Sequence, residues 1–318
     1  MMPNVPTVLN AGYMKDRCQR MVDSKKMYLN PTILLFCLKK QKTNVSFRIR
    51  MSKIFFFIFV MNFSLFCYSQ QVSVSYELNS KKNPHLKRDY ILDINEGKSV
   101  FRTASRKISD INISEGKFGF GFNLNPNFEL YFIKDRDKQV FNKIFFAPMT
   151  RDKFFIPISE VLNWQILSDT ITIGNFKCQK ATVKYGGRNW TAWFNKDILI
   201  PEGPYYFNGL PGLIMQIQDE SEDYIFQIVE IKKSNSIDLH EMRDGIEINW
   251  DQYRKIILNY YQDPYSTLKI QGIPVFTDKE NGGYKEVDYR VRTKEIREML
   301  IKENNPIELN EIVQFEIK

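Results

Sequence analysis

From Gln71 to Ile231 the sequence consists of short runs in which apolar and polar residues alternate. Alternation with a period of two places the apolar side chains on one face of a β-strand. The turn-forming clusters NEGK, DRDK and ESED separate runs, and Gly186-Gly187 offers the positive φ that a tight hairpin needs. Because parallel strands need long crossovers, these short connections predict antiparallel pairing.

Helical periodicity is confined to the C-terminal part. The segment NWDQYRKIILNYYQD spaces apolar and aromatic residues by three and four, with Asn249 as cap, and TKEIREMLIKEN repeats the pattern with Thr293 as cap. We therefore expect residues 70–318 to form a single, mostly β domain. Its predicted architecture is one antiparallel, strongly curved sheet or half-barrel, with two C-terminal helices covering a face or an edge.

The first 69 residues differ from the rest in charge. They contain eleven Lys and Arg but only Asp16 and Asp23 as acids, so the +8 net charge of the whole chain belongs to this leader. The remaining chain has 34 basic and 35 acidic residues and is close to neutral. A near-neutral domain lacks the basic excess typical of phosphate-backbone binding, and we expect no nucleic-acid partner.

Residues 51–69 are predicted to be a secretory signal peptide. Lys53 supplies the positive charge, and the thirteen residues from Ile54 to Phe66 are apolar except for Asn62 and Ser64. Cys67 and Ser69 are the small residues before the cut. A membrane anchor is the alternative, but a span needs about 20 residues, so we expect no transmembrane span after cleavage. Lipidation of Cys67 is disfavoured by the bulky Phe66 before it. The protein is thus expected to be exported.

Residues 1–50 precede a complete signal peptide. We interpret them as a non-native upstream extension, with translation starting at Met51. An unusually long n-region is the alternative.

Few residues beyond the leader suggest chemistry. His85 and His240 lie far apart in polar segments, and neither HExxH nor GxSxG occurs. The glycines of GKFGFG, residues 116–121, alternate with phenylalanines and are interpreted as strand. We therefore predict no catalytic constellation, no metal and no cofactor. Cys178 could serve a thiol-dependent or other hydrolase, but its alternation with Phe176 predicts a small buried hydrophobe.

The stretch GRNWTAWF places aromatic residues on both faces of a predicted strand. Trp190, Ala192 and Phe194 share one face, and Thr191 and Trp193 share the other. Something must cover the second face, either a helix of the same domain or a ligand. Trp190 and Trp193 are therefore candidate binding residues.

Several spaced motifs carry a family resemblance: Trp164, CQKA from Cys178, GRNWTAWF from Gly187, IPEGPYYFNGLPGLI from Ile200 and NNPIEL from Asn304. Together they resemble the GLPGLI family, secreted proteins of Bacteroidota-type bacteria. The family motif corresponds here to Gly209, Leu210, Pro211, Gly212, Leu213 and Ile214. The resemblance covers nearly all of residues 70–318 and implies export to the cell envelope, in the periplasm or at the outer membrane. It implies no catalytic residue, because the family has no established biochemical function.

The motif region interrupts the strands and is the main candidate site. Leu210-Pro211-Gly212-Leu213 suits a type II turn with Gly212 at positive φ. Tyr205, Tyr206 and Phe207 are then held on a constrained excursion. They either pack as a corner over the open end of the sheet or form a preshaped aromatic rim for a ligand or partner.

The function predicted from these features is an exported, non-enzymatic envelope protein that binds a peptide, an apolar ligand or an outer-membrane protein partner. One alternative is a hydrolase working through Cys178. Another is a structural subunit of a surface assembly.

Overall fold

The computed structural model describes residues 71–81, 87–119, 123–150, 152–234, 239, 245–272, 274–278 and 283–316. The described residues belong to one compact unit, Ser69–Lys318. The expected extension (1–50) and signal peptide (51–69) lie outside the described residues, as do His85 and His240. None of the helices in the described ranges is both long and apolar enough to cross a membrane.

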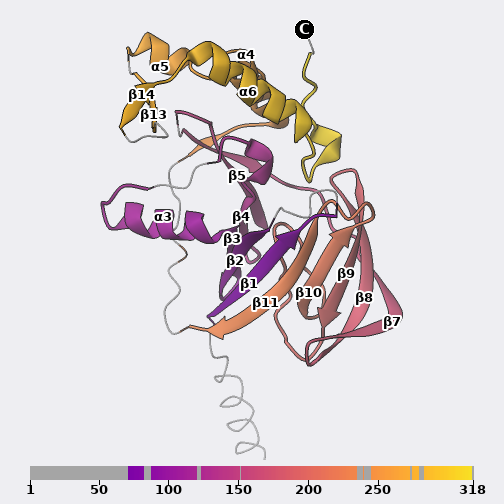
Figure 1. Cartoon of the computed structure of the whole chain (residues 1–318). Helices are drawn as coiled ribbons and strands as arrows, with labels where there is room; N and C mark the ends of the chain where they lie inside the picture. Colours follow the sequence, from indigo (N-terminus) through magenta and orange to yellow (C-terminus); the bar gives the residue numbers. More distant parts are fainter. Residues whose placement is uncertain are drawn as a thin grey trace, which may run out of the picture. The chain divides into compact units, whose positions relative to one another are not determined.

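Twelve strands form one open sheet (Figure 1). Their order is β12-β6-β5-β4-β3-β2-β1-β11-β10-β9-β8-β7, and every pairing is antiparallel except the parallel pair β12 and β6. The bounds are β1 Val72–Asn79, β2 Arg88–Asn95, β3 Lys98–Thr103, β4 Tyr131–Asp135, β5 Val140–Phe146, β6 Lys153–Pro157, β7 Gln165–Ile173, β8 Phe176–Tyr185, β9 Arg188–Asn195, β10 Leu213–Asp219, β11 Ile225–Lys233 and β12 Ile246–Glu247. The mostly β, mostly antiparallel prediction is confirmed, and the strong curvature stays a prediction.

Two meanders build the sheet and meet where β1 pairs with β11. Alternation determines which side chains are buried: in β1 every second residue from Val72 to Leu78 lies in the core. Gly186 (φ 59°) and Gly187 (φ 76°) have the positive φ expected of the β8–β9 turn. The strand predicted at GKFGFG is wrong where it can be checked, because Lys117 to Gly119 has no regular structure and residues 120–122 lie outside the described ranges.

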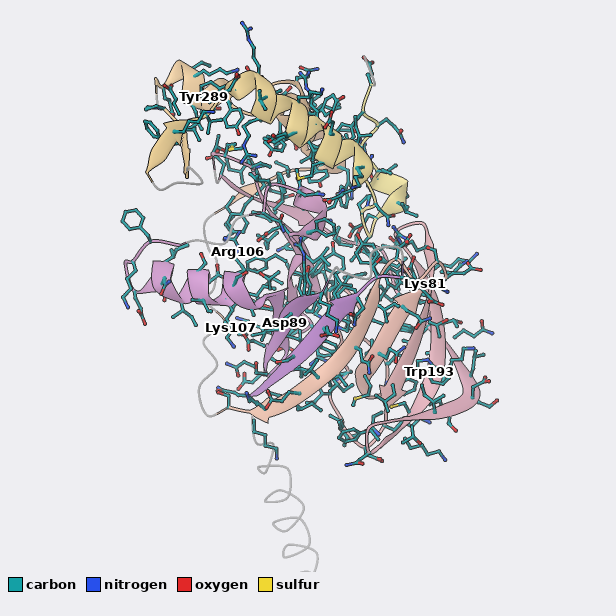
Figure 2. All side chains as sticks on the ribbon, viewed as in Figure 1. Lys81, Asp89, Arg106, Lys107, Trp193 and Tyr289 are labelled. Atoms are coloured by element: carbon teal, nitrogen blue, oxygen red, sulfur yellow. The ribbon has the colours of Figure 1, made fainter. Side chains whose placement is uncertain are left out.

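Helix α3, Ala104–Ser114, contradicts the prediction that helices are confined to the C-terminal part. It packs against β2 and β3 through a polar face made of Arg106, Ser109 and Asp110. Ile108 and Ile113 are instead 53% and 54% exposed. Figure 2 labels Arg106 on this helix.

Buried ion pairs explain the inverted orientation of α3. Arg102 of β3 contacts Asp110 at 2.9 Å and Asp93 of β2 at 3.2 Å. Arg106 contacts Glu129 at 2.7 Å, just after the 3-10 helix η2, Pro126–Phe128. Because buried charges are tolerated only when paired, these contacts determine which face of the helix turns inward.

The C-terminal helices stack in two layers. Helix α4, Trp250–Gln262, begins at the predicted cap Asn249, which forms a capping box with Gln252. Tyr253 of α4 packs edge-on against Phe145 of β5, with ring centroids 4.9 Å apart. Helix α4 therefore covers the β5 part of the sheet, and α6 packs on α4.

Helix α6, Tyr289–Lys302, begins earlier than predicted. Its cap is Asp288, whose carboxylate accepts the backbone N–H of Arg290 at 2.8 Å, so the cap predicted at Thr293 is wrong. The apolar spacing in the sequence begins after the first residues of the helix. The N-terminus predicted from that spacing is therefore too late in the chain. The remaining short elements are α5 Ser266–Ile270, β13 Phe276–Asp278, β14 Tyr284–Glu286 and the 3-10 helix η3 Leu309–Glu311.

Candidate functional site

The excursion between β9 and β10 closes on itself. Glu202 and Asn208 form an isolated antiparallel bridge, and the backbone N–H of Gly209 donates to the carbonyl of Pro201 at 3.1 Å. Tyr205 adopts a φ of 53°, which is uncommon for a residue with a side chain. The chain therefore leaves the sheet and returns to it over a few residues.

A buried ion pair fixes the excursion to β4. Lys134 Nζ lies 2.6 Å from the carboxylate of Glu202 and also donates to the carbonyl of Gly203 at 3.0 Å. Arg136 Nε lies 2.9 Å from the same carboxylate. Burial lowers the pKa of Lys134, and Glu202 acts in the opposite direction. An ion pair between two fully buried side chains, Lys134 and Glu202, thus holds the base of the excursion in one place.

The tip of the excursion is anchored to the C-terminal segment. Tyr205 Oη donates to Glu308 Oε1 at 2.6 Å, and Tyr185 Oη donates to the same oxygen at 2.9 Å. Lys143 Nζ contacts Glu308 Oε2 at 2.6 Å. Burial acts to raise the pKa of Glu308, but Lys143 and the two phenols outweigh it and hold that pKa below its usual value.

Arg188 holds the C-terminal segment against the β8–β9 turn. Its guanidinium donates to Asn305 Oδ1 at 2.6 Å, to the carbonyl of Pro306 at 2.7 Å and to that of Ile307 at 3.1 Å. A Cβ on Gly186 would lie 2.9 Å from the carbonyl oxygen of Ile307. Gly186 is therefore needed for close approach as well as for positive φ.

The type II turn predicted for the family motif is wrong. Gly212 does not have positive φ; Gly209 does, at 89°. A Cβ on Gly212 would lie 2.0 Å from the carbonyl oxygen of Asn195, so Gly212 is needed for close backbone approach to the end of β9. Leu210, Leu213 and Ile214 are buried and join the core, whereas Pro211 is exposed.

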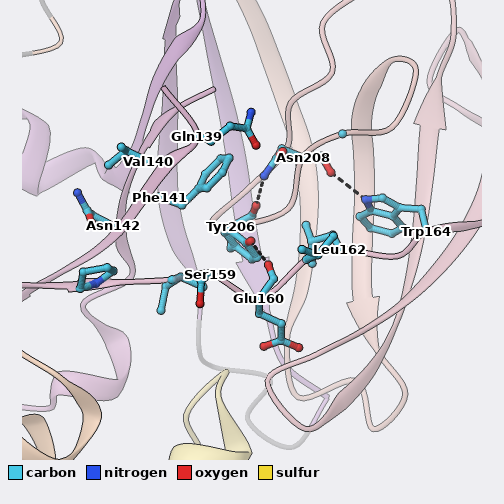
Figure 3. A pocket seen from close by; sticks show the side chains of 14 residues that line it. Gln139, Val140, Phe141, Asn142, Ser159, Glu160, Leu162, Trp164, Tyr206 and Asn208 are labelled. Carbon is cyan, nitrogen blue, oxygen red and sulfur yellow. Dashed lines mark hydrogen bonds between the residues drawn. The ribbon is translucent and has the colours of Figure 1, made fainter. Parts of the chain in front are cut away.

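A pocket of about 520 Å³ lies beside the excursion (Figure 3). Phe141, Leu162, Trp164 and Tyr206 form much of its apolar lining, and Asn208 and Gly209 close one side. Asn142, Ser159 and Glu160 add polar groups. The excursion therefore forms one wall of the pocket, and β5 and the segment between β6 and β7 form the others.

Hydrogen bonds connect the walls of this pocket. Trp164 Nε1 donates to the carbonyl of Asn208 at 2.8 Å, and Asn208 Nδ2 donates to the carbonyl of Tyr206 at 2.7 Å. Tyr206 Oη donates to the carbonyl of Glu160. All three bonds are dashed in Figure 3: the bonds from Trp164 to Asn208 and from Tyr206 to Glu160 join the two sides of the pocket, and the bond from Asn208 to Tyr206 lies within the excursion.

Only part of the candidate set predicted from sequence lies at the pocket. Tyr206 and Gly209 line it, whereas Tyr205 and Phe207 are fully buried behind it. Trp190 lies in the core, with its ring centroid 4.6 Å from that of Phe207. Trp190, Tyr205 and Phe207 therefore pack as part of the core in this structure.

Trp193 lies on the opposite face of β9 from Trp190 and is partly exposed. Lys180 Nζ is 5.9 Å from the centre of its ring. Trp193 does not line the pocket. It remains a candidate contact for a partner on the outer face of the sheet.

Sequence reasoning missed Phe141, Asn142, Glu160 and Leu162. The first two lie on a predicted strand, and nothing in the alternation marks them as different from other strand residues. The segment around Glu160 and Leu162 has no periodicity, so only its position before Trp164 could have drawn attention to it.

Cys178 is fully buried in β8. Its thiol lies 3.5 Å from the carbonyl of Phe176, and burial raises its pKa. A protonated, buried thiol is a poor nucleophile. Among the described residues, no group of three or more His, Cys, Asp or Glu side chains could hold a metal ion.

No family model and no curated protein match the chain. Among solved structures, the one described as "Structure of PNGF-II in P21 space group" has a TM-score of 0.45 and 15% identity over 59% of this chain and 33% of that chain. "Structure of PNGF-II in C2 space group" has a TM-score of 0.44 and 14% identity over 66% and 35%. The chain spans about a third of the length of these structures, and similarity this low carries no argument about activity.

Proposed function

We propose that this chain is an exported, non-enzymatic cell-envelope protein that binds an extended peptide or another apolar ligand in the pocket beside the GLPGLI motif. The observation that carries the proposal is the pocket wall made by Tyr206, Asn208 and Gly209. The predicted signal peptide and the resemblance to the GLPGLI family support export. The strong curvature expected of the sheet belongs to the same proposal, since a curved sheet would shelter a ligand.

The size and chemistry of the pocket support ligand binding. A volume of about 520 Å³ is within the usual range of small-molecule and peptide side-chain sites. Aromatic and aliphatic walls favour burial of an apolar group, and a few polar side chains can orient it. The excursion is held by Glu202 and Glu308 before any ligand arrives, so binding need not order it.

An assembly subunit is the second candidate, and strand β7 favours it. This nine-residue strand is largely exposed, and within the described part of the chain it pairs only with β8. An unpaired strand edge can accept a strand from a protein partner, including an outer-membrane protein. Stable co-purification of such a partner, lost when Thr170 is replaced by proline, would favour this candidate.

Dansylamide, a neutral apolar fluorophore, tests the pocket directly. We expect its fluorescence to rise on binding, with an affinity several-fold weaker in Leu162→Ala, because a wall side chain is removed. Val229→Ala is the matched control, since Val229 is 66% exposed on β11. Equal affinities for both variants, or no binding to the unmodified protein, would contradict the proposal.

A further inference from the structure

Among the described residues that line the pocket, Glu160 alone is charged. Its side chain extends from the segment that Tyr206 ties to the excursion (Figure 3). Partial burial raises the pKa of Glu160, the backbone N–H of Gly186 lowers it, and the nearby charge of Glu308 raises it. Glu308, itself an anion, is the one charged side chain among these influences, so no described cation neutralises the Glu160 carboxylate.

Lys143, the cation bound to Glu308, is not available to Glu160. Lys143 is 2.6 Å from Glu308 and is largely buried with it, so its charge is already paired. The other polar side chains of the lining, including Asn142 and Ser159, are neutral. A ligand cation placed beside Glu160 would therefore meet one unopposed carboxylate at the edge of an apolar surface.

We propose that the pocket selects ligands that join an apolar body to a protonated amine, and that Glu160 binds the amine. The inference rests on the proposed function and specifies the ligand class. Apolar walls bind the body of the ligand, and a charge-assisted hydrogen bond to the carboxylate orients its cationic end. A free aliphatic amine, a peptide N-terminus and a lysine side chain all have this chemistry.

Three dansyl probes separate charge from apolar contact. Dansylcadaverine has an amine, dansylamide is neutral, and the carboxylate of dansylglycine is negative. We expect dansylcadaverine to bind roughly five-fold more tightly than dansylamide, as for a partly exposed ion pair, and dansylglycine to bind most weakly. Equal affinity for the amine and the amide would overturn the inference.

Glu160→Gln tests whether the Glu160 carboxylate causes the preference for the amine probe. This change retains the shape of the side chain and an acceptor for Gly186, and we expect dansylcadaverine to lose its roughly five-fold advantage over dansylamide. Glu230→Gln is the control, because Glu230 lies on β11 and does not line the pocket. An amine preference that survives Glu160→Gln overturns the inference. If none of the three probes binds the unmodified protein, the proposed function itself fails.

Competition against dansylcadaverine distinguishes the sources of the amine. The peptide Phe-Gly-Gly-amide with a free N-terminus is compared with its N-acetylated form and with hexylamine. Displacement by the free peptide alone would identify a peptide terminus, and displacement by hexylamine alone would identify a small amine. Displacement by the acetylated peptide as strong as by the free one would overturn the role of the amine.

Discussion

The phenol of Tyr205 donates a 2.6 Å hydrogen bond to the carboxylate of Glu308, 103 residues later in the chain. Tyr185 and Lys143 bind the same carboxylate, so one buried charge joins the excursion, two strands and the C-terminal segment. The motifs GPYYFNGLPGLI and NNPIEL are therefore parts of one packed unit. A substitution that disturbs the packing of one motif should therefore also disturb the packing of the other.

Tyr205→Phe should lower the free energy of unfolding by about 1–3 kcal/mol, because Glu308 loses one of its buried donors. Glu308→Gln should cost about 3–5 kcal/mol, since it leaves the buried ammonium of Lys143 without a counter-charge. Urea denaturation measures both effects. Tyr261→Phe is the control, because its hydroxyl makes an exposed bond. Equal small losses of stability in all three variants would mean that the contacts of Glu308 with Tyr205 and Lys143 contribute little to the free energy of unfolding.

The pH dependence of stability follows from the lowered pKa of Glu308. A carboxyl whose pKa is lower in the folded than in the unfolded state stabilises the fold above the unfolded value of about 4.5. That contribution is lost as the pH falls through the folded value. The stability advantage of the unmodified protein over Glu308→Gln should therefore shrink between pH 5 and pH 3, measured by urea denaturation at each pH.

Glu298→Gln is the control for this titration, because Glu298 is 67% exposed. Its difference from the unmodified protein should stay small across the range. An advantage over Glu308→Gln that is constant from pH 7 to pH 3 would show that the charge of Glu308 does not stabilise the fold.

Gly209 and Gly212 should respond differently to the same substitution. Gly212→Ala forces a Cβ against the carbonyl of Asn195 and should cost about 1–3 kcal/mol through overpacking. Gly209→Ala meets open space and should cost about 1 kcal/mol through its positive φ alone. Gly174→Ala, also at positive φ in open space, is the matched control.

Asparagine separates the two causes, because it tolerates positive φ better than alanine does. Thermal denaturation should therefore find Gly209→Asn milder than Gly209→Ala, whereas Gly212→Asn should be at least as harmful as Gly212→Ala. The reverse order at Gly212 would mean that backbone conformation, and not close approach, requires its glycine.

The strands could be predicted from sequence because alternation reports directly which side chains are buried. Helix α3 could not, since its buried face is the charged one, whereas helical periodicity is recognised by a buried apolar face. The position of Gly212 was misjudged for a related reason. A glycine has the same appearance in sequence whether it provides positive φ or close approach, and only the neighbouring carbonyl of Asn195 distinguishes the two.

The candidate site could be predicted only in outline. The motif drew attention to Tyr206, because glycine and proline interrupt the strands there. Its partners Phe141 and Glu160 come from other elements, and their proximity depends on how β5 and the segment after β6 meet the excursion. Such proximity between distant parts of the chain leaves no local pattern in a single sequence.

Cys178 should react slowly with a thiol reagent. Its burial and raised pKa leave little thiolate at neutral pH. Dithionitrobenzoate should therefore label Cys178 only after the protein unfolds. The measurement compares the rate in buffer with that in denaturant. Fast labelling of the native protein would revive the hydrolase alternative.

Tyr206→Phe should weaken ligand binding more than it weakens the fold. The hydroxyl of Tyr206 donates to the carbonyl of Glu160, whereas its ring still packs against Phe141 and Tyr185 after the change. Burial, with a contribution from Glu160, raises the pKa of Tyr206 to about 12, so the hydroxyl remains a donor at neutral pH. We expect a loss of stability of about 1 kcal/mol.

The larger effect of Tyr206→Phe should be on the pocket wall at residues 159–163, which the hydroxyl tethers to the excursion. Its amide hydrogens should exchange faster, and dansylamide should bind several-fold more weakly, because the wall must then be ordered on binding. Tyr205→Phe is the matched comparison: it removes a hydroxyl one residue away and should cost stability while leaving exchange in the wall unchanged. If Tyr206→Phe leaves both exchange and affinity unchanged, the hydroxyl does not maintain the pocket, and the excursion acts only as part of the core.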